Sequence, residues 1–135
     1  MTTIPLSPFL RRVLAVDAAS CLGMGAICAA GAGMLAGPLG LPRMLLLASG
    51  LVLLLCAAVI GWLALRREAP RALVLAVIAG NAAWVAGSLL LLASPFVAPT
   101  TLGALFLLAQ AAAVAVLAEL EWVGLRRSAA GVVPA

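Results

Sequence analysis

The chain has 135 residues, of which 67% are hydrophobic and only 9% are charged. Soluble domains carry roughly 45–50% apolar and 25% charged residues, so this composition excludes a water-soluble fold. A net charge of +4 would favour nucleic-acid binding in a soluble protein. Here the basic residues are short arginine groups beside apolar segments, which indicates contact with membrane lipids and no nucleic acid.

Four apolar segments fill the chain. A membrane-spanning helix needs about 20 mostly apolar residues, and each segment meets that length. The sequence therefore predicts an all-α protein, a four-helix transmembrane bundle in a single integral membrane domain covering residues 1–135. The predicted helices are 14–35, 44–65, 72–92 and 101–123.

The first segment is poor in leucine and rich in Gly, Ala, Ser and Cys. It is longer than the 7–15 apolar residues of a secretory signal peptide, so we expect it to be retained. Helical spacing places a set of small and polar residues on one stripe: Asp17, Ser20, Cys21, Met24, Cys28 and Gly31. Small residues let helices approach closely in lipid, so this helix should be the most enclosed. Leucine at Gly23 or Gly31 should accordingly destabilise the protein more than leucine at Gly50.

Arginine positions predict the orientation of the bundle. Only Arg43 lies between the first and second segments or between the third and fourth. The other seven lie at the opposite side of the segments: Arg11, Arg12, Arg66, Arg67, Arg71, Arg126 and Arg127. The positive-inside rule then puts both termini in the cytoplasm, with two up-down hairpins reversing at Gly37–Pro42 and Ser94–Pro99. The expected location is the bacterial cytoplasmic (inner) membrane.

Aromatic residues mark the predicted cytoplasmic interface. Trp62 and Trp122 each stand four residues before an arginine pair, and an indole ring favours the headgroup level. We expect these tryptophans and the pairs that follow them to anchor the second and fourth helices: Arg66, Arg67, Arg126 and Arg127.

The two halves of the chain share several positions. Asp17-Ala18-Ala19 and Asn81-Ala82-Ala83 are each followed by a glycine at the same offset, and each half ends in Trp-x-x-Leu-Arg-Arg. Duplication of a two-helix unit would produce this pattern, with an axis along the membrane normal. Independent selection for interface residues would also produce the repeated endings.

Few polar residues lie inside the predicted spans. Asp17, Glu119 and Glu121 should lie at similar depth near the cytoplasmic face, with Glu119 pointing away from Glu121. We expect these carboxylates to meet arginines or headgroup water, and the alternative is a proton or cation site. In the third helix, Asn81, Trp84 and Ser88 share a face.

Two further sets of polar side chains lie within the spans. The side-chain amides of Asn81 and Gln110 both lie near the middle of the membrane, and we expect them to form a hydrogen bond with each other. Cys21, Cys28 and Cys56 are expected to be buried free thiols. Cys21, Met24 and Cys28 form a line of soft ligands, but the chain has no histidine to complete a metal set. No metal and no cofactor is therefore expected.

Three segments carry a family resemblance: Leu14–Asp17, Asn81–Trp84 and Ala118–Arg127. They resemble a widespread group of uncharacterised short four-span bacterial integral membrane proteins. The resemblance covers most of the chain, and it implies the architecture and no activity. In size and in its acid in helix one, the chain is also similar to small multidrug-resistance exporters, but their aromatic-rich chamber is missing.

No pattern in the sequence indicates an enzyme, because there is no histidine, no nucleophile with a base and no phosphate-binding glycine loop. The expected function is a non-catalytic accessory subunit or self-associating bundle, with other membrane subunits or further copies as partners. The alternative is a small transporter or a proton or cation channel using Asp17 and the acidic end of the fourth helix.

Overall fold

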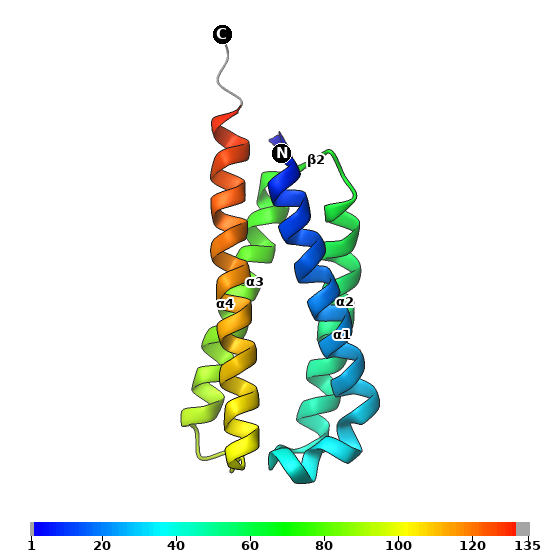
Figure 1. Ribbon diagram of the computed structural model, residues 1–135, viewed down its shortest axis with the longest axis vertical. Coiled ribbons are helices and arrows are strands. Elements are labelled where there is room, and N and C mark those ends of the chain that lie inside the picture. The colour runs from blue at the N-terminus through cyan, green and yellow to red at the C-terminus, as the bar shows by residue number, and fades with distance from the viewer. Residues whose placement is uncertain (1, 132–135) are drawn as a thin grey trace.

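The computed structural model describes residues 2–131 and contains four long helices and one short strand pair. The helices are α1 (Pro8–Leu39), α2 (Arg43–Ala64), α3 (Arg71–Ala93) and α4 (Thr101–Ala130). Each of them is long and apolar enough to cross a membrane, which confirms the prediction of four apolar helices of membrane-spanning length. Figure 1 shows the four helices side by side.

The helices pack as two pairs joined along one seam. α1 packs along α2, α3 packs on α4, and α1 and α4 form the contact that joins the pairs. α2 and α3 make almost no direct contact. In Figure 1, α1 and α2 accordingly form one pair of ribbons and α3 and α4 the other. The bundle is therefore closed on the α1–α4 side and open between α2 and α3.

Helix α1 is longer than the predicted span 14–35 at both ends. At its start, the Ser7 hydroxyl accepts a hydrogen bond from the Leu10 amide at 3.2 Å, and Pro8 occupies the first turn, where its missing N–H costs nothing. The predicted helix began only after the arginine pair, because hydropathy marks the apolar span. Charged residues outside the lipid core can still be helical, so the helix itself begins earlier.

The far end of α1 closes in a Schellman motif. Gly40 adopts a left-handed conformation with φ of 62°, and the Leu41 and Gly40 amides donate to Ala36 and Gly37 carbonyls at 3.2 and 3.1 Å. Leu41 is then buried in the apolar cluster beneath the turn. Pro38 thus lies inside the last turn of α1, and the predicted loop from Gly37 shrinks to three residues.

Two short strands were not predicted. β1 (Thr3–Pro5) pairs antiparallel with β2 (Glu68–Pro70), with Ile4 opposite Ala69. Both of these central residues are buried in the apolar cluster at this end of the bundle. Three-residue strands containing proline show no alternation in sequence, so only their meeting in space reveals them.

Helix α4 continues to Ala130, seven residues beyond its predicted end at position 123. Gly124 lies inside the helix and packs against α1. A Cβ placed there would lie 3.1 Å from the Leu10 Cβ atom. Beyond it, the Ser128 hydroxyl accepts a hydrogen bond from the Ser7 amide at 3.1 Å. The end of α4 is therefore held by the start of α1.

At the opposite end, the two short loops contact each other. The Thr100 amide and hydroxyl donate to the Leu39 and Pro38 carbonyls at 3.1 and 2.7 Å. The same hydroxyl caps α4 by accepting from the Gly103 amide at 3.1 Å. Gly103 itself lies directly on the Leu39 carbonyl, where no side chain would fit. Thr100 thus joins the end of α1 to the start of α4.

In its most apolar 18-residue stretch, α1 buries a larger share of residues, 39%, than the other three helices do in theirs, as predicted. The glycines that allow this are different from those expected. Gly25 and Gly50 provide the close approach of α1 and α2, because a Cβ at Gly50 would lie 2.5 Å from the Ala29 amide nitrogen and 2.8 Å from the Gly25 carbonyl oxygen. Gly23 faces open space, and Gly31 meets only Leu35 of its own helix. The expected order of their substitutions is therefore wrong.

We predict that Gly50→Leu destabilises the protein strongly, because the side chain must displace the backbone of α1, whereas Gly23→Leu has little effect. The loss should reach roughly 1–3 kcal/mol or more for Gly50→Leu. Thermal unfolding of both variants in detergent measures it. Equal melting temperatures for the two variants would mean that the α1–α2 contact is looser than described.

Candidate functional site

Three polar side chains from three helices meet in the α1–α4 seam. The Asn81 amide nitrogen in α3 donates to Asp17 Oδ2 in α1 at 2.9 Å and to Glu121 Oε2 in α4 at 3.1 Å. Cys21, one turn beyond Asp17, places its sulfur 3.7 Å from Asp17 Oδ1. Asp17 and Glu121 are fully buried, and Asn81 is 8% exposed. We call Asp17, Asn81 and Glu121 the carboxyl cluster.

The carboxyl cluster contains no basic residue. Within residues 2–131 no arginine forms an ion pair with either acid, and the Oε1 atom of Glu121 is buried without any hydrogen-bond partner. Arg12, the arginine nearest to Asp17 in sequence, is exposed. The Arg11 guanidinium donates to the Ala64 carbonyl at 3.1 Å and not to a carboxylate. The expectation that Asp17 and Glu121 meet arginines or headgroup water is therefore wrong.

Local sequence explains how each member reaches the cluster. Asp17 lies on the buried stripe of α1 with Cys21, Gly25 and Cys28, which recur every three or four residues. Glu121 lies on the face of α4 that packs against α1, three residues before Gly124. The buried face of α3 holds Val74, Asn81 and Ser88 at seven-residue spacing.

The remaining polar candidates lie elsewhere. Ser20 is exposed, off the stripe on which it was predicted. Glu119 is exposed and points away from Glu121, as predicted. The expected bond between Asn81 and Gln110 is not formed, because both Asn81 amide protons go to the carboxyl cluster. Gln110 instead lines a cavity.

The predicted interface anchors lie at the end of the bundle that holds the strand pair. Trp62 and Trp122 are 47% and 42% exposed. The Arg66 guanidinium lies over the Trp62 ring, 4.4 Å from its centre. Arg67 and Arg126 are exposed. Arg127 stacks on Phe9 at 5.1 Å, so it connects α4 to the start of α1.

The three cysteines are free thiols. Cys21 and Cys28 are buried and Cys56 is half-buried, in agreement with the predicted packing role. Within the described part of the chain, no three His, Cys, Asp or Glu side chains come together closely enough to hold a metal ion.

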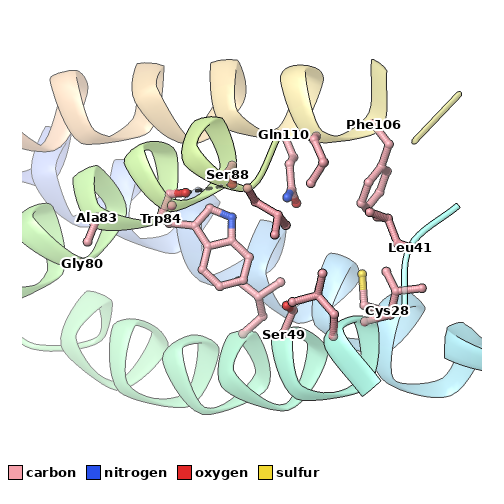
Figure 2. Close-up of a pocket in the computed structure, with 15 residues that line it drawn as sticks. Cys28, Leu41, Ser49, Gly80, Ala83, Trp84, Ser88, Phe106 and Gln110 are labelled. Carbon is pink, nitrogen blue, oxygen red and sulfur yellow. Dashed lines mark hydrogen bonds between the residues drawn. The ribbon is translucent and has the colours of Figure 1, made fainter. Parts of the chain in front are cut away.

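Two cavities occupy the open side of the bundle between α2 and α3. Their volumes are about 430 Å³ and 390 Å³, and both are lined by Leu53, Gly80 and Trp84. We call these two cavities together the α2–α3 cleft. Within residues 2–131 no charged residue lines it, and Asn81 forms part of the wall of the smaller cavity. Figure 2 shows Trp84 and Gln110 within the larger cavity, which Cys28, Ser49 and Phe106 also border.

No pattern in the sequence pointed directly to the α2–α3 cleft. Gly80, Trp84 and Gly87 recur at helical spacing in α3, and Gly80 and Gly87 have open space where a Cβ would lie. Small residues beside an aromatic ring at this spacing were the available signal. It does not distinguish a helix-packing surface from a cavity wall, because both favour small side chains.

No protein-family model, curated protein or solved structure matches this chain. The resemblance to short four-span bacterial proteins therefore stays a prediction, and function has to be argued from the carboxyl cluster and the α2–α3 cleft.

We predict that Asn81→Leu destabilises the bundle by roughly 1–3 kcal/mol, because it leaves two buried carboxyl groups without their shared donor. Ser88→Ala is the matched control on the same face of α3. The Ser88 hydroxyl donates only to the Trp84 carbonyl of its own helix, so its loss should change little. Thermal unfolding in detergent compares them, and similar stability for both variants would contradict the importance of the Asn81 bonds.

Proposed function

We propose that this chain is a small proton-exchanging transport protein in which Asp17 and Glu121 hold one proton between them. The observation that carries the proposal is a pair of fully buried acids that share one amide donor and have no basic partner within residues 2–131. Ionisable residues in this situation inside a membrane protein commonly belong to proton relays.

Electrostatics supports a single proton on the pair. One oxygen of each acid accepts a hydrogen bond from the same Asn81 nitrogen, so the two oxygens are within about 6 Å of each other. Two negative charges at that distance repel by about 3 kcal/mol at an effective dielectric constant of 20. One proton removes that repulsion and gives the unpartnered Glu121 oxygen a hydrogen to share. Another titratable group that faces the pair is Cys21 of α1, and Cys21 and Cys56 of α2 both line the smaller cavity.

The position of the pair fits exchange with one side of the membrane. Asp17 follows Arg12 by five residues and Glu121 precedes Arg126 by five, so both acids lie about 7.5 Å along their helices from exposed arginines. The arginine distribution favours a cytoplasmic location for this end, with two up-down hairpins and both termini inside in a bacterial inner membrane. The cluster would then exchange protons with the cytoplasm when the α1–α4 seam opens.

The orientation can be tested by reporter fusions after residue 135 and within the loop Pro95–Pro99. We expect cytoplasmic activity from the first fusion and periplasmic activity from the second, because seven of the eight arginines lie at the proposed inner side. A periplasmic signal from the C-terminal fusion would overturn the topology.

We predict that purified wild-type protein in liposomes takes up protons in response to an imposed pH gradient. Asp17→Asn and Glu121→Gln should each lower this flux at least tenfold, since each removes one of the two proton-sharing groups. Glu119→Gln, two residues away and exposed, is the matched control and should keep the wild-type flux. A pH-sensitive dye inside the liposomes reports uptake.

If wild-type protein gives no proton flux above that of empty liposomes, the transport proposal is wrong. The second proposal is then a non-catalytic accessory subunit or self-associating bundle, in which the carboxyl cluster only fastens the helix pairs. It is supported by the two Asn81 hydrogen bonds, which tie α3 to both α1 and α4. Mass spectrometry of the protein purified in mild detergent would then identify its partner subunits or further copies.

A further inference from the structure

The α2–α3 cleft has the size and lining of a small-molecule site. Ligand pockets commonly measure about 300–1,000 Å³, and the two cavities, at about 430 and 390 Å³, share three wall residues. The walls are mainly aliphatic, with aromatic rings from Trp84 and Phe106. Because no charged residue in the described part of the chain lines either cavity, an ionised molecule would enter without a counter-charge from it.

Two of the polar side chains that line the cleft, Gln110 and Trp84, have no protein hydrogen-bond partner within residues 2–131: no hydrogen bond joins the Gln110 amide or the Trp84 indole N–H to another protein group. In Figure 2 the Gln110 amide points into the larger cavity, on the side where the Trp84 ring lies. Unsatisfied donors are costly at membrane depth, so these groups call for an occupant that accepts hydrogen bonds.

We propose that the α2–α3 cleft binds a neutral, planar, lipophilic molecule carrying a hydrogen-bond acceptor. The ring system lies against Trp84 in the space left open at Gly80, and the acceptor faces the Gln110 amide. A plain hydrocarbon chain would fill the space but leave the Gln110 amide unsatisfied. As a binding site the cleft stands on its own geometry, and only its use as a transport substrate site rests on the proposed function.

The test uses 9-fluorenone, which is neutral and planar with one carbonyl, and fluorene, which has the same ring system without the carbonyl. The chain is placed in nanodiscs, and the excess of each compound over empty nanodiscs is measured after equilibrium dialysis. We expect saturable binding near one fluorenone per chain. Gln110→Leu should weaken fluorenone binding about tenfold, the value of one hydrogen bond, and leave fluorene binding unchanged.

Two glycines provide a matched control for the location. Gly80 and Gly23 both have open space where a Cβ would lie, but only Gly80 lines the cleft. Gly80→Leu should abolish the saturable binding of both compounds, whereas Gly23→Leu should keep it. If Gly80→Leu lowers thermal stability, Ala83→Leu fills the larger cavity from the same helix and replaces it in the test.

Three results would overturn the proposal. One is fluorenone uptake that is the same for wild-type protein and the cavity-filling variants, because the compound would then be only dissolved in lipid. Another is unchanged fluorenone binding by Gln110→Leu, which would show that the ligand needs no hydrogen-bond acceptor for the Gln110 amide. The third is a wild-type dimer in native mass spectrometry that Gly80→Leu converts to a monomer, since the occupant would then be a second copy. Saturable binding by wild-type protein that shows no proton flux would retain the site and reject only its coupling to transport.

Discussion

The Asn81 side chain is the group on which the assembly of this bundle depends. Apolar burial gives little drive for helices to associate in lipid, so close backbone contact and interhelical hydrogen bonds must hold them together. Gly25 and Gly50 provide the first between α1 and α2. Asn81 provides the second, because its one amide nitrogen bonds acids in both α1 and α4. It connects α3 to a helix that α3 scarcely touches otherwise.

The two contacts between the helix pairs differ: α1 packs on α4, whereas α2 and α3 make almost no direct contact. On the proposed internal repeat, α1 corresponds to α3 and α2 to α4, and the matched residues Asp17 and Asn81 contact each other directly. The α1–α4 contact and the α2–α3 contact would then be equivalent, yet the first is packed and the second is open. The carboxyl cluster occupies the closed side, and the cavities occupy the open one.

The cluster and the cleft share a residue. Asn81 bonds the carboxyl pair and also forms part of the wall of the smaller cavity. A molecule in the cleft that shifts the Asn81 amide would alter the donor that Asp17 and Glu121 share. This juxtaposition offers a physical route by which occupancy of the cleft and protonation of the acids could influence each other.

Composition and hydropathy by themselves determined the membrane helices, because a 20-residue apolar run has no stable alternative outside lipid. Periodicity also placed Asp17 on the enclosed stripe of α1. The tertiary structure alone decided the helix ends, the strand pair and the partners of Asp17, Asn81 and Glu121. Hydropathy weighs each residue singly, whereas the end of α4 packs against the start of α1 at Gly124 and Ser128. The partner of a buried amide likewise depends on which of several polar side chains the packing of helices brings within about 3 Å.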